Sequence, residues 1–229
     1  PMNSWDKSDS GICKGGDDGI GCENCAKEVP CEHTYDHSFQ LGKADHELMM
    51  KLAAGGPVHA KYRRMITVYL DITAPLYWWK EFDTYKVGTV ANSCSTMHKI
   101  QAKEFTLDDF SHEHLLSIPG EGVLPPLSVL KTTIDTLNAY RALYVSTNTK
   151  PNRDGTALSE ECCRKLKKDI WWQMIQLLPS SYNQKRTVML NYEVLVGIYR
   201  WRKEHKLDEW REFCQWIEQL PYSEIITGA

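Results

Sequence analysis

The clearest pattern of hydrophobic and polar residues is a strict alternation over residues 65–73. Apolar side chains at every second position, separated by threonine, tyrosine and aspartate, predict a half-buried β-strand with one polar face. The apolar residues of this strand are Ile66, Val68, Leu70 and Ile72. Ala74-Pro75 follows directly, and Pro75 suits the first turn of a helix because its missing N–H would have no partner there.

Elsewhere the apolar residues recur at intervals of three and four, which predicts amphipathic helices. Gly55-Gly56 ends the first of these, and Ser159 is placed to cap a later one. Residues 101–126 and 148–155 read as loops because they are rich in turn-forming residues. The predicted helices cover residues 45–54, 127–145, 160–177, 191–205 and 207–220, with a further helix beginning after Pro75.

Composition places the chain among globular proteins and narrows its partners. It has 229 residues, of which 42% are hydrophobic and 25% charged, with a formal net charge of −3. Nucleic-acid binders usually carry a basic excess, so nucleic acid is not an expected partner. No apolar run approaches the roughly 18 residues of a membrane span, and the cysteines are unlike those of a small secreted scaffold. We therefore expect a cytoplasmic protein with no membrane partner.

The first 43 residues differ from the rest because they are polar, glycine-rich and rich in cysteine. They contain Cys22-x-x-Cys25-x5-Cys31-x-His33. Two thiolates on a tight turn, with a later Cys and His, can supply the four ligands of a structural zinc ion. The alternative is a loop with free thiols. We expect residues 1–43 to be a separate cysteine-rich segment and 44–229 to be the main domain.

A second set of metal-ligating residue types lies within residues 108–114. Two histidines and three carboxylates occur there, at Asp108, Asp109, His112, Glu113 and His114. They lie in a predicted loop with no fixed spacing, and acidic surface loops are common. A solvated loop is the simpler interpretation, and a metal site is the alternative.

Candidate chemistry concentrates in the segment from Gly88 to Thr96, which consists mostly of small and hydroxylated residues. A helix that stops in such a run leaves backbone N–H groups and hydroxyls available to an oxygen-rich ligand. Thr89, Asn92 and Ser95 are its main polar side chains. The segment is therefore a candidate phosphate-binding site.

The order of these landmarks resembles the flavin-dependent thymidylate synthases, the ThyX family. The resemblance rests on His59, sixteen residues before Pro75, and on Lys86, eleven after it, in the register of the last arginine of the family's Arg-His-Arg motif. Thr89, Asn92 and Ser95 then correspond to the family's hydroxyl and amide cluster. Leu178-Pro179, Asn191 and Arg202 match the later Leu-Pro, the Asn-led helix and its closing arginine.

Several positions depart from the family's pattern. The Arg-His-Arg register reads Thr84-Tyr85-Lys86, and Thr96-Met97 stands where the family has a phosphate-binding arginine. Glu193, Gly197 and Ile175 replace further polar or basic positions. An arginine fork binds phosphate with a bidentate geometry that these residues cannot reproduce. The departures predict altered chemistry.

The resemblance implies an α+β fold with an antiparallel sheet and a predominantly helical C-terminal half. It further implies a homotetramer that binds FAD and a pyrimidine nucleotide and performs reductive methylation, with the reactive chemistry supplied by the cofactors. It assigns the flavin to His59, Tyr85, Lys86, Thr89, Asn92, Ser95 and Asn191, and the nucleotide to Lys185, Arg186 and Arg202.

Two alternatives remain open beside this enzyme. The first is a non-catalytic protein of the same fold that sequesters or senses a nucleotide, including a cyclic one, with Tyr77, Trp78, Tyr85 and Trp201 stacking on bases. The second is that the tryptophans are core and subunit contacts, that Lys86 and Arg202 form surface ion pairs, and that the function lies elsewhere.

Overall fold

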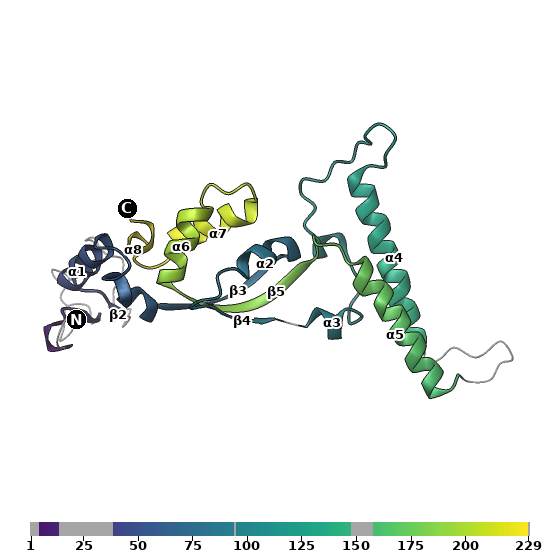
Figure 1. Cartoon of the computed structure of the whole chain (residues 1–229), viewed down its shortest axis with the longest axis horizontal. Helices are drawn as coiled ribbons and strands as arrows, with labels where there is room; N and C mark the ends of the chain where they lie inside the picture. The colour runs from purple at the N-terminus through teal and green to yellow at the C-terminus, as the bar shows by residue number, and fades with distance from the viewer. Residues whose placement is uncertain (1–4, 14–38, 94, 148–157, 229) are drawn as a thin grey trace. The chain divides into compact units, whose positions relative to one another are not determined.

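The computed structural model describes residues 5–13, 39–93, 95–147 and 158–228 (Figure 1). The chain forms two compact units. Unit 1 comprises residues 1–68 and 190–229, and unit 2 comprises residues 69–189. Two long strands pass from one unit into the other.

Unit 1 is mostly helical. The amphipathic pattern predicted for its last long helix is confirmed, because Trp210, Phe213, Cys214 and Ile217 are all buried. Burying a stripe of this kind is the main reason that such a short helix is stable. The elements of unit 1 are η1 (Trp5–Lys7), β1 (Gly11–Ile12), β2 (Phe39–Gln40), α1 (Lys43–Ala54), η3 (Ala60–Met65), α6 (Tyr192–Arg202), α7 (Asp208–Glu218) and α8 (Glu224–Thr227).

Unit 2 is built on a three-stranded sheet with the order β3-β5-β4. The strands are β3 (Thr67–Pro75), β4 (Val90–Ser93) and β5 (Asn183–Asn191). β4 pairs with β5 antiparallel, with Asn92 opposite Thr187. The backbone N–H of Leu76, just after β3, donates to the carbonyl of Tyr182, just before β5, over 3.0 Å. β3 and β5 therefore also run in opposite directions.

One face of this sheet is covered by α2 (Leu76–Phe82). Trp78, Trp79 and Phe82 are almost completely buried, and the indole N–H of Trp79 donates to the carbonyl of Gln184 over 2.9 Å. Side chains alternate between the two faces of a strand, so every second residue of β5 points away from α2. The opposite face is mostly exposed and carries Asp71, Lys185 and Thr187 together with the exposed Tyr69 and Val90.

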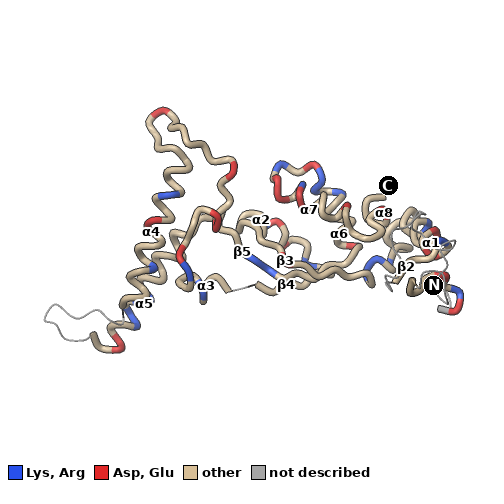
Figure 2. Tube along the Cα trace, turned by 180° about the vertical axis from the view of Figure 1, so that it is seen from behind, with Lys and Arg blue, Asp and Glu red and all other residues tan. Residues whose placement is uncertain are grey.

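The remaining helices of unit 2 form a hairpin in which α4 (Pro126–Ser146) lies along α5 (Glu160–Leu177) (Figure 1). Two short helices, α3 (Thr96–Lys99) and η4 (Leu107–Asp109), complete the unit. Figure 2 shows basic positions on β5 and along α5. The hairpin closes over a hydrophobic core made by Ile100, Phe105, Phe110, Leu130, Ile134, Leu137 and Met174.

The predicted α+β class is confirmed, with an antiparallel sheet and a largely helical second half. Every predicted long helix is present with ends shifted by a few residues, and Ser159 caps α5 by accepting from the N–H of Cys162 over 3.3 Å. In the described part of the chain, no helix is long and apolar enough to cross a membrane.

The candidate phosphate-binding segment after Gly88 contains a strand that was not predicted, because residues 90–93 pair with β5 at the edge of the sheet. The spacing of Cys162, Leu166, Ile170, Met174 and Leu177 predicts Cys162 as a core residue and Cys163 as a surface residue, and this prediction is wrong: Cys162 is exposed and Cys163 is half-buried. The strand β5 was not predicted at all.

Candidate functional site

A pocket of about 270 Å³ lies in unit 2 where β5 begins. We call it the β5 pocket. Four segments distant in sequence line it, namely the end of β3, the start of α3, the loop that contains η4, and the start of β5. Its lining residues are Thr73, Ser95, Thr96, Lys99, Lys103, Asp108, Asp109, Tyr182, Asn183, Gln184 and Lys185.

Gln184 connects the elements that meet at this pocket. Its side-chain amide donates to the hydroxyl of Thr96 over 3.0 Å, and its side-chain carbonyl accepts from Arg186 Nε over 2.9 Å. Its backbone carbonyl accepts from the buried indole of Trp79. Because the tryptophan is fixed in the core, these bonds hold the start of β5 and the start of α3 in a defined position.

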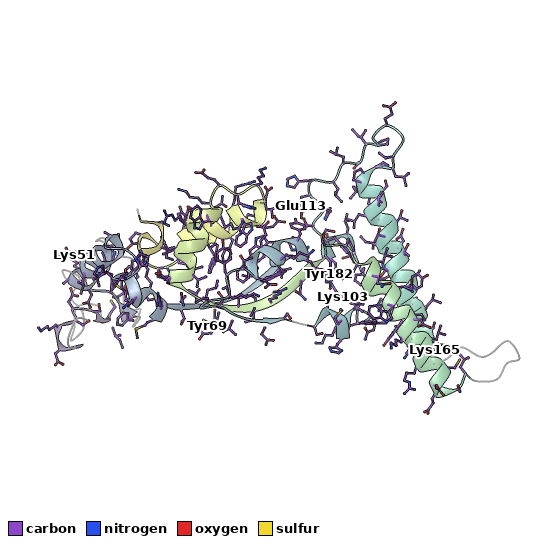
Figure 3. All side chains as sticks on the ribbon, viewed as in Figure 1. Lys51, Tyr69, Lys103, Glu113, Lys165 and Tyr182 are labelled. Atoms are coloured by element: carbon purple, nitrogen blue, oxygen red, sulfur yellow. The ribbon has the colours of Figure 1, made fainter. Side chains whose placement is uncertain are left out.

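Lys103, on the loop before η4, is bound to a carboxylate of the same pocket. Its ammonium group contacts Asp109, which also accepts from the backbone N–H of Thr106 over 2.9 Å. Burial alone would raise the pKa of Asp109, but the bonds from Lys103 and Thr106 outweigh it and lower this pKa. The bond to Asp109 raises the pKa of Lys103. Figure 3 labels Lys103 and Tyr182, which both line the pocket.

Lys185, at the other side of the pocket, is also paired. Its ammonium group lies 2.7 Å from Asp71 of β3, whose second oxygen accepts from Thr187 over 2.6 Å. The bond from Lys185, followed by the bond from Thr187, lowers the pKa of Asp71. Lys99 is different, because it forms no ion pair with any residue that the structure describes. Among its described residues, the pocket therefore presents the unneutralised ammonium group of Lys99, two ion pairs and the carboxylate of Asp108.

The structure brings two predicted residues together in this pocket. Ser95 comes from the predicted flavin set and Lys185 from the predicted nucleotide set, and the two are ninety residues apart in sequence. The antiparallel pairing of β4 with β5 causes this proximity, since it places Ser93 opposite Arg186. Hydroxyl, amide and ammonium groups of this kind are suited to binding phosphate oxygens.

The other members of the predicted polar cluster lie elsewhere in unit 2. Asn92 lies on exposed β4 opposite Thr187. Thr89 precedes β4 and Ser95 follows it, so the two residues belong to opposite ends of this strand. Lys86 is exposed in the turn after α2, and Tyr85 is half-buried in the same turn. The cluster is therefore spread along both ends of β4.

Arg186, adjacent to Lys185 in β5, points to the opposite face of the sheet. Its guanidinium group contacts Asp83 over 2.8 Å and lies 4.2 Å from the centre of the Trp79 ring. Its side chain is only 16% exposed. These contacts give Arg186 a role in holding α2 on the sheet, while Lys185 faces the pocket.

Three predicted residues belong to unit 1 and are described there. His59 is exposed just before η3. Asn191 is buried and caps α6 by accepting from the N–H of Val194 over 3.0 Å. The guanidinium group of Arg202, at the end of α6, lies 4.8 Å from the centre of the Trp210 ring. The cap explains why an asparagine leads this helix.

The predicted zinc ligands Cys22, Cys25, Cys31 and His33 lie outside the described residues. Within residues 5–13, 39–93, 95–147 and 158–228, no three His, Cys, Asp or Glu side chains gather as a metal site. In the loop at 108–114, Glu113 instead accepts from Ser111 over 3.0 Å and from the N–H of His112 over 2.8 Å. Local hydrogen bonds thus occupy this carboxylate.

Sequence reasoning missed several residues of the β5 pocket, including Thr96, Lys99, Lys103 and Gln184. The available signal was the alternation of Thr187-Val188-Met189-Leu190, in which Val188 and Leu190 are completely buried. Reading this run as a strand beside the predicted strand at 65–73 would have placed Gln184 and Lys185 at the sheet's end.

The fold of the chain is that of the flavin-dependent thymidylate synthases. Two solved structures of thymidylate synthase X (ThyX) from Helicobacter pylori, both with FAD and dUMP, superpose on it with TM-scores of 0.51 and 0.50. Each match covers 81% of this chain and 82% of the other chain at 16% sequence identity. No protein-family model matches the sequence, and no curated protein matches it either.

Proposed function

We propose that this protein binds a pyrimidine nucleotide and FAD, and that it performs a modified form of the reductive methylation carried out by thymidylate synthases of this fold. The observation that carries the proposal is the convergence of Ser95, Lys99 and Lys185 in one pocket. This pocket occurs in a fold shared with two structures that contain FAD and dUMP.

The nucleotide phosphate would bind in the β5 pocket. Lys99 carries a charge with no partner among the described residues, and Lys185 is 57% exposed and so can turn from Asp71 toward a ligand. Ser95 and Thr96 add hydroxyl groups. The pocket volume of about 270 Å³ is close to the lower end of the volumes of ligand pockets. A pocket of this size fits a phosphate and its sugar better than a whole dinucleotide.

The flavin would bind beside β4 through Lys86, Thr89 and Asn92, with Tyr85 near the ring system. The hydroxyl of Thr89 is buried with no hydrogen-bond partner, and Lys86 forms no ion pair with any described residue. A buried hydroxyl without a partner is costly unless a ligand supplies one. The residues therefore fit an FAD phosphate, and bound flavin would supply the hydride chemistry.

The same proposal keeps His59 and Asn191 as flavin-binding residues, Arg202 as a nucleotide-binding residue and a homotetramer as the assembly. A cytoplasmic location and a zinc ion on Cys22, Cys25, Cys31 and His33 belong to this proposal too.

A specific observation favours the second candidate, a non-catalytic nucleotide-binding protein. The described residues that line the β5 pocket include no arginine, and Arg186 is occupied by Asp83, Gln184 and Trp79. The residues at the Arg-His-Arg positions are also different, with Thr84, Tyr85 and Lys86 in their place. Tight binding of a pyrimidine nucleotide, and catalysis on it, would therefore need other contacts.

The decisive experiment is reconstitution with FAD. Purified protein is incubated with FAD, desalted and examined for the visible absorbance of bound flavin. We expect it to retain flavin, and to oxidise NADPH only when dUMP is present. Retained flavin without NADPH oxidation would favour the non-catalytic protein, and failure to retain any flavin would contradict the proposed enzyme. Lys86→Gln should weaken retention, and Lys80→Gln on α2 is the matched control.

A further inference from the structure

A second pocket lies on the α4–α5 hairpin of unit 2 and shares no lining residue with the β5 pocket. We call it the hairpin groove. Its volume is about 690 Å³. It is formed by the C-terminal end of α4 and the N-terminal half of α5, and its principal lining residues are Tyr144, Cys163, Arg164, Lys167, Lys168 and Trp171.

Positive charge is concentrated on the side of α5 that faces the groove. Arg164, Lys167 and Lys168 occupy positions i, i+3 and i+4, which lie on one face of a helix. None of the three forms an ion pair with any residue that the structure describes. Among the described residues that line the groove, Glu160 at the start of α5 is the only acidic one. Figure 2 shows the basic positions along α5.

Aromatic rings provide the other part of the groove. The indole N–H of Trp171 donates to the carbonyl of Met97 over 2.9 Å, and its ring packs edge-on against Trp172 with centroids 4.8 Å apart. These contacts fix the orientation of the Trp171 ring. Tyr144 of α4 lies opposite, with the ammonium group of Lys167 5.1 Å from its ring centre. The groove therefore combines a fixed aromatic surface with unneutralised cations.

We propose that the hairpin groove binds a nucleoside phosphate, with its phosphate on Arg164 and Lys168 and its base against Trp171. Like-charged side chains one turn apart repel one another, and a phosphate removes this repulsion through charge-assisted hydrogen bonds. A flat aromatic surface stacks with any base. A volume of about 690 Å³ lies within the range of small-molecule sites.

The size of the charged cluster favours a single nucleotide over a nucleic-acid strand. The three cations lie within five residues of helix, a rise of about 6 Å, so the cluster is short. A single-stranded nucleic acid needs a longer basic track, and the chain as a whole carries a net charge of −3. This proposal does not depend on FAD or on the β5 pocket.

Cys163 provides a reporter inside the groove. Its half-buried thiol lines the groove, whereas the adjacent Cys162 is exposed and does not. In a Cys162→Ser background, alkylation of Cys163 by iodoacetamide is followed by peptide mass spectrometry with AMP, GMP, CMP or UMP present. We expect at least one of these to slow the reaction at least fivefold at saturation. In a Cys163→Ser background, the same nucleotide should leave the alkylation of Cys162 unchanged.

Charge variants test the assigned contacts. The double substitution Arg164→Gln, Lys168→Gln should abolish the protection, whereas Lys165→Gln, which removes a neighbouring charge outside the groove, should preserve it. Lys185→Gln should also preserve it, which separates this site from the β5 pocket. Circular dichroism and urea unfolding verify that the variants are folded.

Four results would overturn the proposal. The first is no protection of Cys163 by any of the four nucleotides, and the second is full protection in the double variant. The third is equal protection by inorganic phosphate, which would show that the ring contributes nothing. The fourth is stronger protection by a single-stranded oligonucleotide than by mononucleotides, which would show that the ligand is a nucleic acid and not a single nucleotide.

Discussion

The β5 pocket and the hairpin groove use the same residue types in opposite ways. In the β5 pocket, Lys103 and Lys185 are bound to Asp109 and Asp71. In the groove, the three cations of α5 have no acidic partner among the described residues. The first arrangement is ordered by its own ion pairs, and the second is left with a net charge for a ligand to neutralise. The number of cations does not distinguish the two sites, but the presence or absence of acidic partners does.

The two sites also differ in the contacts that hold their lining residues in position. The β5 pocket is held by a hydrogen-bonded link from Gln184 to the buried Trp79. In the groove, the aromatic residues Tyr144 and Trp171 pack against the core of the hairpin, whereas the cations Arg164, Lys167 and Lys168 do not belong to that core. We therefore expect substitutions in the β5 pocket to couple stability with binding, and substitutions of the groove's cations to change binding with little change in stability.

The largest effect is expected from Trp79→Ala. This change removes a fully buried indole and its bond to Gln184, so we expect the free energy of unfolding to fall by about 3–5 kcal/mol. Urea denaturation measures it. Trp172→Ala, at a side chain that is 42% exposed, is the control and should cost much less. Equal losses in the two variants would contradict the role given to Trp79.

The second effect concerns Cys214, a buried reference thiol for the labelling of Cys163. Burial, followed by the charge of Glu218, raises the pKa of Cys214 to about 11. At pH 8 its alkylation should be at least about 100-fold slower than in the urea-denatured chain, where thiols titrate near 8.5. The rate should continue to rise to about pH 11. A plateau near pH 9 would show that the thiol is not shielded.

The same pKa has a consequence for stability. Because the pKa of Cys214 is higher in the folded state than in the unfolded state, the stabilisation is complete below about pH 8.5 and is lost as the pH rises toward 11. Cys214→Ala should reduce this alkaline loss. Urea unfolding at a series of pH values compares the two proteins, and identical pH profiles would contradict the assignment.

A smaller effect is expected from Asp71→Asn, which removes the carboxylate partner of Lys185. The β5 pocket then becomes more like the groove, whose cations have no acidic partner among the described residues. The substitution removes the negative charge of Asp71 beside Lys185, so nucleotide affinity should rise a few-fold. The pKa of Asp71 is lowered by the bonds from Lys185 and then Thr187, so protonating Asp71 at acidic pH should act in the same direction. Calorimetric titration at neutral pH measures the change, and unaltered affinity would show that the Asp71 pair does not restrain Lys185.

How far the sequence predicted the fold depended on whether the information was local. The stripe of Trp210, Phe213 and Ile217 predicted α7 because helical burial is encoded in neighbouring residues. β4 was missed because its sequence, Val-Ala-Asn-Ser, is small and polar and becomes a strand only through pairing with β5. Tertiary pairing cannot be read from such a segment alone.

The same limit applied to the candidate site. Ser95 and Lys185 were predicted singly, but their proximity depends on the register between β4 and β5. A one-residue difference also decides that Lys185 faces the pocket while Arg186 faces α2. The groove was not predicted because the helical periodicity of α5 identifies only its apolar stripe. The charged residues lie outside this stripe, where a solvated helix face is the usual interpretation.

The most direct test of the account is calorimetric titration of the FAD-incubated protein with dUMP. We expect saturable binding that Lys99→Gln and Lys185→Gln each weaken about tenfold or more, since a charge-assisted hydrogen bond contributes roughly 1.5–3 kcal/mol. Lys80→Gln, an exposed lysine outside the pocket, should bind as the unaltered protein does. Binding that is absent, or that survives both pocket substitutions unchanged, would contradict the assignment of the β5 pocket as the phosphate site.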